Sequence, residues 1–471
     1  MSYWESGWAP GARSRAAFDA EQEHLAPGTQ SFALFSGLCI DRGEGAALYD
    51  LDGHRYVDLM AGIGVASLGY AHPKYVAAMQ RQVARIHVGS FTSEHRAALV
   101  RLLADVAPGD VNRTQFYSSG AEAVESALRL ARAHTGRHEV VGFWGSFHGK
   151  TGGVLPLLAS SFKHGLGPLA PGLYSTPYAS CARCVFGHAP DRCAWQCLEF
   201  LRRKIELETT DRVAAIIVEP IQGTAGNVVP PPGFLRALRA LADEVGALLI
   251  CDEMITGFGR TGRMFAVEHD GVVPDIMTVG KGFGGGFPMS GLLARESVAF
   301  AQPWANPSGS SSSYGGNPLA AAAARVTLET ILEDGLVEHS RALGERMLAE
   351  LRRWEGEVPV VSNVRGRGLM LGLDLVVPGT RRLLDRRVTR WVFDRLLARG
   401  VLAMIYAPEV RINPPLVITE DEAMGALAAV REVLLEVSER LAGGGPDGGP
   451  DGGPAAEGNG AGHGVPSALL A

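Results

Sequence analysis

Between residues 114 and 294 the sequence alternates between short apolar runs and helical stretches. Amphipathic helices are expected over 121–134 and 234–245, and a glycine lies just beyond each of them. The apolar runs are continuous, which is typical of strands that are buried on both faces. This pattern predicts an α/β fold in which helices cover both faces of a mainly parallel sheet. The expected strands are TQFY (114–117), EVVGF (139–143), AAIIVE (214–219), ALLICD (247–252), IMTV (276–279) and SGLLA (290–294).

The segments before and after this alternation predict a smaller α+β domain. Residues 46–59 are expected to form a β-hairpin, and 369–375 and 410–416 are short strand candidates among helical stretches. An Ala-rich helix over 317–333 leads out of the sheet domain. The end of the chain is rich in Gly and Pro and too poor in apolar residues to fold. We therefore expect an N-terminal arm and hairpin that belong to the small domain (1–75), a large domain (76–333), the C-terminal part of the small domain (334–441) and a disordered tail (442–471).

Composition limits the classes of partner. The 471 residues carry a formal net charge of −6, which gives no reason to expect nucleic acid as a partner. No apolar run reaches the length of about 18 residues that suggests a membrane span. The first ten residues lack the basic region and apolar stretch of a secretory signal. These features predict a cytoplasmic protein.

Small molecules bind beyond the carboxyl ends of parallel strands, so the residues that follow each strand are the candidate site. After the first strand, Ser118 and Ser119 lead into a helix that begins with Gly120 and Ala121. The free N–H groups and the dipole of a helix N-terminus favour an anion such as phosphate. The alternative is that the serines only cap the helix, with Glu122 in its first turn.

Two further strand ends carry candidate ligand-binding residues. The loop WGSFHGKT after the second strand is one residue too short for a P-loop, and we interpret Phe147 as a stacking ring with His148 beside it. The alternative places the Phe in the core and the His at the rim. Asp252 ends the fourth strand, where an Asp can hold the protonated nitrogen of a pyridine ring. An acidic strand end also fits the magnesium site of a P-loop ATPase or kinase, which is the alternative class of enzyme.

Lys281 follows the fifth strand in the run IMTVGKGFGGGFP. A lysine among glycines is open to a small molecule and can form a Schiff base with a carbonyl once its amine is deprotonated. It could instead be a phosphate-binding or merely solvated lysine. An anion site, an aromatic ring, an acid and this lysine together match the phosphate, ring face, ring nitrogen and aldehyde of pyridoxal 5′-phosphate.

From about residue 45 to 435 the chain resembles the class III aminotransferases, which are pyridoxal-phosphate enzymes of fold type I. The resemblance rests on runs such as SSGAEAVE, GSFHGKTGG, VEPIQG, ICDEMITGFGRTG, VGKGFGGGFP, YGGNP, VRGRGLMLG and VRINPPLVITEDE. The chain is also similar to dialkylglycine decarboxylase across HEVVGFWGSFHGKTGG. The resemblance implies that Lys281 is the Schiff-base lysine and that Asp252 pairs with the ring nitrogen. It also implies that Gly120 and Ala121 bind the phosphate, with Ser119 nearby. Phe147 would stack on the ring, with His148 next to it in the motif. Glu219 would lie beside the substrate end of the cofactor.

The same resemblance implies a homodimer and a carboxylate-binding arginine. Ser313 stands where the family has a Thr that reaches the cofactor phosphate of the partner subunit, and Arg411 matches the arginine that binds a substrate carboxylate. Ile255 replaces a Gln that contacts the ring hydroxyl in many members. Thr224 replaces the Glu that shields this arginine in members that use 2-oxoglutarate. Ile63 replaces the pocket Gln of the decarboxylase, which weakens that alternative.

We therefore expect an enzyme that moves an amino group between an amine or amino acid and a keto acid by a ping-pong course. A decarboxylase of the dialkylglycine type and an amino-acid racemase are the alternatives. The sequence also contains C-x2-C-x8-C-x3-C, formed by Cys181, Cys184, Cys193 and Cys197. This spacing could hold structural zinc or an iron–sulfur cluster, or the thiols could be free. The expected catalysis needs no metal.

Overall fold

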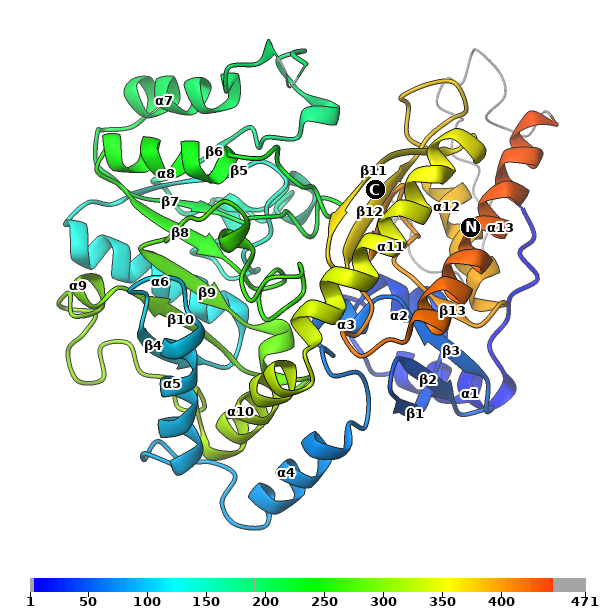
Figure 1. Cartoon of the computed structure of the whole chain (residues 1–471), viewed down its shortest axis with the longest axis horizontal. Coiled ribbons are helices and arrows are strands. Elements are labelled where there is room, and N and C mark those ends of the chain that lie inside the picture. The colour runs from blue at the N-terminus through cyan, green and yellow to red at the C-terminus, as the bar shows by residue number, and fades with distance from the viewer. Residues whose placement is uncertain (1–3, 190–191, 444–471) are drawn as a thin grey trace.

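The computed structural model describes residues 4–189 and 192–443, and most of the predicted tail (442–471) lies outside them. Figure 1 shows two lobes, one built around a large sheet and the other from the two ends of the described chain. The fold is α/β with a mainly parallel central sheet, so the predicted fold class is confirmed. In the described part of the chain, no helix is both long enough and apolar enough to cross a membrane.

The central sheet contains every strand expected between residues 114 and 294. Only β10 runs antiparallel to its neighbours, so the other strands end at the same edge of the sheet. The sequence reading missed β6, a short and partly exposed strand at the end of the sheet. The strand order is β4 (Arg113–Tyr117), β10 (Ser290–Ala294), β9 (Ile276–Val279), β8 (Leu248–Asp252), β7 (Val213–Val218), β5 (Glu139–Phe143) and β6 (Leu173–Thr176).

Helices cover both faces of this sheet, which explains why its strands are continuously apolar. In β7, Ala215 and Ile217 belong to the apolar cluster that contains the buried face of α6 (Gly120–Thr135). Their neighbours Ile216 and Val218 belong to a cluster on the other side with α8 (Phe234–Glu244). All four β7 side chains are fully buried. Burial of this kind contributes about 25 cal/mol per Å² of apolar surface, so neither face tolerates a polar residue.

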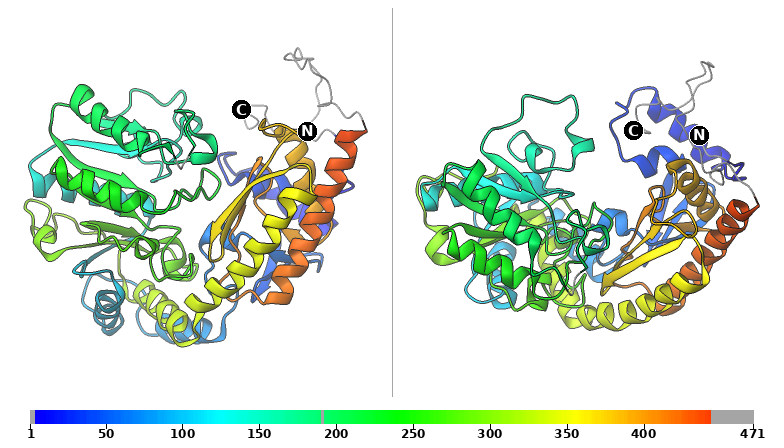
Figure 2. Two further views of the ribbon diagram at one scale, coloured as in Figure 1. Left: turned by 45° about the horizontal axis from the view of Figure 1, so that its top comes forward. Right: turned by 90° about the horizontal axis from the view of Figure 1, so that it is seen from above.

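The second lobe joins the two ends of the chain. Strands β1 (Ile40–Glu44), β2 (Ala47–Asp50) and β3 (Arg55–Asp58) continue into β13 (Val401–Leu402), which pairs parallel to β3. A second sheet contains β11 (Val361–Arg367), β12 (Met370–Leu375) and β14 (Glu409–Ile412). Figure 2 shows the blue N-terminal segment beside the orange C-terminal segment in both views. The domain boundaries at residues 75, 333 and 441 stay a prediction.

Several of the remaining helices lie in segments for which none was expected from the sequence. Residues 74–106 contain two helices, because residues 84–93 leave the helical conformation. Helix α10 occupies the Ala-rich segment as expected. The helices not yet given are α1 (Ala12–Gln22), α2 (Ser31–Ser36), α3 (Ala61–Gly64), α4 (Pro73–Val83), α5 (Glu94–Val106), α7 (Gln196–Glu208), α9 (Glu296–Ala299), α10 (Pro318–Glu333), α11 (Leu336–Glu357), α12 (Arg386–Leu397) and α13 (Glu420–Ala442).

Two glycines of α11 provide a test of how this helix packs on the turn between β11 and β12. A Cβ at Gly344 would lie 2.1 Å from the carbonyl oxygen of Gly368, whereas nothing lies within 4 Å of a Cβ at Gly356. We expect Gly344→Ala to lower the free energy of unfolding by about 1–3 kcal/mol, because the backbone must move apart. Gly356→Ala should be neutral or stabilise by up to about 1 kcal/mol. Urea unfolding measures both variants, and equal effects would contradict the close packing.

Candidate active site

Lys281 lies at the carboxyl edge of the central sheet, two residues beyond β9. Its φ of +46° is in the left-handed region, which is uncommon for a residue with a side chain and often marks a functional position. Burial lowers the pKa of Lys281, although the charges of Asp252 and Glu219 oppose this change. A lowered pKa makes the neutral, nucleophilic amine easier to form.

Asp252 is held at the end of β8 by three donors. Its Oδ2 lies 2.6 Å from Nδ1 of His148, and its Oδ1 accepts hydrogen bonds from the hydroxyl of Thr278 (3.0 Å) and from the backbone N–H of Met254 (3.1 Å). The aspartate is only 1% exposed. These contacts fix the direction of a buried carboxyl group on the strand adjacent to the one that leads to Lys281.

The alternative that placed His148 at the rim of the site is wrong. His148 is 2% exposed, because the loop after β5 folds back over the sheet edge. Burial opposes its charged form, but the hydrogen bond and charge of Asp252 raise the pKa of His148 above its ordinary value. Within the described residues its Nε2 atom has no hydrogen-bond partner. His148 is therefore a buried partner of Asp252.

Glu219 connects the ends of two further strands. It follows β7, its Oε1 accepts a hydrogen bond from the backbone N–H of Phe147 (2.8 Å), and its Oε2 accepts one from the N–H of Gly223 (3.0 Å). Burial raises the pKa of Glu219. The Phe147 ring is partly exposed and packs edge-on against Phe162, with 5.4 Å between ring centres. Glu219 thus fixes the backbone that carries this ring.

The N-terminus of α6 shows that the capping interpretation and the anion interpretation are compatible. The Ser119 hydroxyl accepts a hydrogen bond from the N–H of Glu122 (3.3 Å), whose carboxylate accepts one from the N–H of Ser119 (2.8 Å). This arrangement is a capping box. Among the described residues, the N–H groups of Gly120 and Ala121 donate to no protein acceptor. They remain available to an anion.

The loop that resembled a P-loop does not continue into an α-helix. Turns and a short 3₁₀ segment follow Gly149, whereas a P-loop places phosphate at the start of a helix. Lys150 lies over the rings of Phe147 and Phe162 instead, 5.9 and 5.0 Å from their centres. The structure therefore gives no support to the ATPase alternative.

Arg411 lies on β14 in the second lobe. Burial lowers the pKa of Arg411, and a hydrogen bond with Tyr406 opposes this change. No carboxylate forms an ion pair with it in the part of the chain that the structure describes. Thr224 is partly exposed, and the buried Ile255 packs between Gly64 and Gly223. Arg411 is thus a guanidinium of limited exposure on which Glu219 and Glu409 act through their charge, without forming an ion pair with it in the described residues.

Ser313 is exposed on the loop between α9 and α10. A buried hydroxyl cluster holds the base of this loop. The Ser310 hydroxyl lies 2.6 Å from the Tyr117 hydroxyl and 2.8 Å from that of Ser126, which also accepts a hydrogen bond from the indole N–H of Trp304 (2.9 Å). Because Tyr117 ends β4 directly before the α6 N-terminus, the loop with Ser313 and the candidate phosphate site share one support.

The sequence reading missed residues that complete the site. Thr278 faces Asp252 through the β8–β9 pairing, and no local pattern in IMTV signals this contact. The Tyr178 hydroxyl donates to the backbone oxygens of Glu219 and Pro220, both at 3.1 Å. These contacts depend on strand register and loop folding, which a single sequence does not reveal.

The cysteine segment does not form a metal site in the described residues. Cys181, Cys184, Cys193 and Cys197 are free. Burial raises the pKa of Cys181, with further effects from Cys193 and Cys184, so these thiols are neighbours. No group of three or more His, Cys, Asp or Glu side chains in residues 4–189 and 192–443 is arranged to hold a metal ion.

Residues 30–434 match the family model described as Aminotransferase class-III. An acetylornithine aminotransferase of Methanopyrus kandleri is 41% identical over 395 residues, which cover 83% of this chain and 93% of that protein. An alanine/serine racemase of Pyrococcus horikoshii is 34% identical over 440 residues, which cover 90% and 91%. The structure of an amine transaminase from an uncultivated Pseudomonas species, in its PLP-bound form, superposes with a TM-score of 0.81 at 29% identity and covers 88% of this chain and 99% of that one.

The acid next to Asp252 provides a test of burial beneath the site. Glu253 is fully buried, accepts a hydrogen bond from the N–H of Val267 (2.9 Å), and has its pKa raised by burial from 4.5 to about 7. The folded protein therefore binds a proton that the unfolded chain releases, so the free energy of unfolding falls as the pH rises between these two values. We expect Glu253→Gln to remove roughly 2–3 kcal/mol of this fall.

Urea unfolding across this pH range measures the difference between the wild type and Glu253→Gln. Glu206→Gln serves as the control, because the side chain of Glu206 is 59% exposed. If the free energy of unfolding changed with pH in the same way for the wild type and for Glu253→Gln, the prediction of a raised pKa for Glu253 would be wrong.

Proposed function

The chain belongs to the class III aminotransferase family and is a pyridoxal-phosphate-dependent enzyme, and we propose that Lys281 is the residue that binds the cofactor covalently. One observation carries this assignment. Lys281 follows β9, and the neighbouring strand β8 ends in an aspartate that three donors hold in place. With these groups the enzyme moves an amino group between an amine or amino acid and a keto acid.

The residues at the sheet edge fit each part of the cofactor. The free N–H groups of Gly120 and Ala121 suit its phosphate, with Ser119 holding the helix start. Phe147 offers a ring for stacking, and Ile255 offers an apolar wall without a hydrogen bond. Asp252 suits the ring nitrogen, because a carboxylate stabilises a proton there. When bound, the cofactor supplies an electron sink for the bond broken at the substrate carbon.

Four residues of this chain then act on the reaction. Asp252, oriented by His148, keeps a proton on the ring nitrogen. Lys281, once its amine is free, would take the proton from the substrate carbon and deliver it to the cofactor carbon that carries the aldehyde, and its lowered pKa favours the neutral amine that this transfer needs. Glu219 holds the loop of Phe147 in place by accepting a hydrogen bond from the Phe147 N–H. The two half-reactions use the same site, so the kinetics are ping-pong.

Arg411 is proposed to bind the carboxylate of the keto acid. A guanidinium binds a carboxylate through two parallel, charge-assisted hydrogen bonds. No protein carboxylate in the described structure occupies this position, and Thr224 cannot provide one. The substrate's own charge therefore completes the pair. This assignment makes at least one substrate of the enzyme a carboxylic acid.

We further propose a homodimer in which Ser313 reaches the cofactor phosphate of the other subunit. Three features support it: Ser313 is exposed, the base of its loop is fixed by Tyr117 and Ser126, and two large aromatic side chains are exposed. Tyr314 is 65% exposed, and Phe91 is 88% exposed. Exposed aromatic side chains of this size are typical of protein interfaces.

The assignment of Lys281 is tested by reducing the purified protein with borohydride and mapping its peptides by mass. We expect a phosphopyridoxyl group on Lys281, because burial lowers the pKa of this lysine. Lys281→Ala should lack the group and the visible chromophore. Lys150→Ala is the matched control, since Lys150 lies close to Phe147 but is exposed. An adduct on any other lysine would refute the assignment.

The reaction is tested by supplying amino donors and keto acids and measuring all products. We expect one keto product per amino product and parallel initial-rate plots. The racemase is the second candidate, because one relative that covers 90% of the chain carries that activity in its name. Loss of optical activity in alanine with its amino group retained would favour the racemase. Release of carbon dioxide faster than keto product would favour the decarboxylase.

A further inference from the structure

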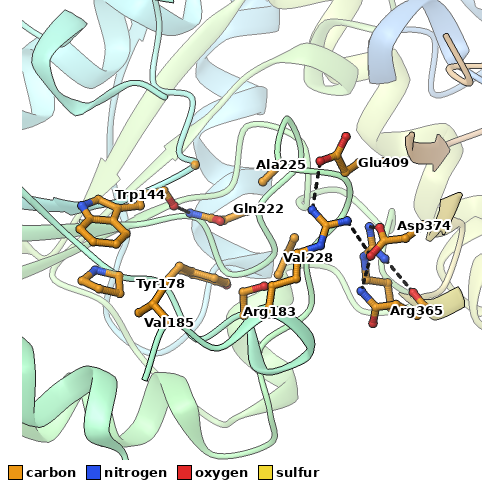
Figure 3. A pocket seen from close by; sticks show the side chains of 14 residues that line it. Trp144, Tyr178, Arg183, Val185, Gln222, Ala225, Val228, Arg365, Asp374 and Glu409 are labelled. Carbon is orange, nitrogen blue, oxygen red and sulfur yellow. Dashed lines mark hydrogen bonds and ion pairs between the residues drawn. The ribbon is translucent and has the colours of Figure 1, made fainter. Parts of the chain in front are cut away.

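Arg183 joins the two lobes at the rim of a cavity. It belongs to the short 3₁₀ segment Cys181–Arg183 of the cysteine-containing stretch in the large lobe. The cavity has a volume of about 280 Å³, and its lining includes Arg183, Asp374, Glu409 and Arg365. Figure 3 shows Arg183 between the two carboxylates of the other lobe. The proposed function gives this arginine no role.

The two carboxylates depend on Arg183 to different degrees. Its guanidinium lies 2.8 Å from Asp374 and 3.0 Å from Glu409. Asp374 also pairs with Arg365 at 2.9 Å and accepts a hydrogen bond from Asn363 at 2.8 Å. In the described part of the chain, Glu409 has no other ion-pair partner. Loss of Arg183 would therefore free Glu409 and leave Asp374 paired.

Glu409 is placed to compete for Arg411. Both residues belong to β14, and residues two positions apart on a strand point to the same face. The strand pairing puts Glu409 opposite Asp374 and Arg411 opposite Gly372. Burial lowers the pKa of Arg411, and the charge of Glu409 opposes this change, after the larger effects of Tyr406 and Glu219. Even so, the carboxylate of Glu409 is directed to Arg183.

The loop that carries Thr224 packs against the stem of Glu409. A Cβ at Gly226 would lie 2.8 Å from the Cβ of Glu409 and 2.8 Å from a guanidinium nitrogen of Arg365. The stem of Glu409 is thus packed against this loop. Its side chain is 29% exposed, and its carboxylate is directed to Arg183 in this structure.

We propose that Arg183 is a positioning residue that holds Glu409 away from Arg411 and so keeps Arg411 free for the keto-acid carboxylate. The inference rests on the proposed function, in which Arg411 binds that carboxylate. Thr224 carries no charge that could act on Arg411. The inference gives that role to the pair of Arg183 and Glu409. It also gives the cysteine-containing stretch a part in substrate selection.

The test compares apparent KM values for a keto acid such as pyruvate in the holoenzyme. Arg183→Gln should raise KM by about threefold to tenfold with little change in kcat, because the freed carboxylate competes with the substrate across a partly exposed site. Glu409→Gln should not raise it. The double variant Arg183→Gln/Glu409→Gln should have the same KM as Glu409→Gln. If Arg183 had only a structural role, the double variant would keep the raised KM.

Arg202→Gln is the matched control for the loss of a surface ion pair. The Arg202 side chain is 43% exposed and pairs with Glu199 and Glu244, whereas that of Arg183 is 41% exposed. Arg202→Gln should leave KM unchanged. A crystal structure of Arg183→Gln should show Glu409 within about 4 Å of Arg411. This readout does not depend on activity.

The inference is overturned if Arg183→Gln leaves KM unchanged, or if the double variant keeps the raised KM. Arg411→Ala separates this failure from failure of the proposed function. A rise of KM by tenfold or more in Arg411→Ala, with no effect of Arg183→Gln, would refute only the inference. An unchanged KM in Arg411→Ala would refute both, because Glu409 would then have no substrate site to occupy.

Discussion

The register in which β8 and β9 pair is the constraint on which the site depends. Asp252 faces Thr278 in this pairing, and Lys281 follows three residues later. A slip of one residue would turn Thr278 to the other face of the sheet and remove a hydrogen bond from the buried aspartate. The slip would also exchange the apolar side chains that pack against α6 and α8. Packing on both faces of the sheet therefore fixes the chemistry at its edge.

The same edge shows how the fold accommodates charged groups away from water. Transfer of an unpaired charge into the interior is costly, and Asp252 and Glu219 avoid this cost through hydrogen bonds to His148, Thr278 and backbone N–H groups. Arg411 differs from them, since in the described residues its guanidinium has a hydrogen bond with Tyr406 but no ion pair with a carboxylate. A guanidinium of this kind favours a ligand that brings a negative charge. This is the reason for our proposal that Arg411 binds a substrate carboxylate.

Much of this architecture could be predicted from the sequence. Continuous apolar runs predicted every parallel strand of the central sheet except β6, whose partly exposed residues at the sheet end gave no such signal. Strand β11 was missed for a similar reason, because its residues are mostly half-buried and include two arginines. The buried place of His148 could not be predicted, since it depends on how the loop after β5 folds. The ion pairs of Arg183 could not be predicted, because its partners lie about 190 to 230 residues further along the chain.

The parallel pairing of β3 with β13 has a consequence for how the chain reaches this structure. Val57 pairs with Val401, which is synthesised only after every strand of the central sheet. At a synthesis rate of about 5–20 residues per second, the N-terminal hairpin waits on the order of tens of seconds for its last strand. During that time the edge of β3 has unpaired N–H and C=O groups that could pair with another chain. The pairing of β3 with β13 therefore comes late in synthesis, and the β3 edge is open to other strands until then.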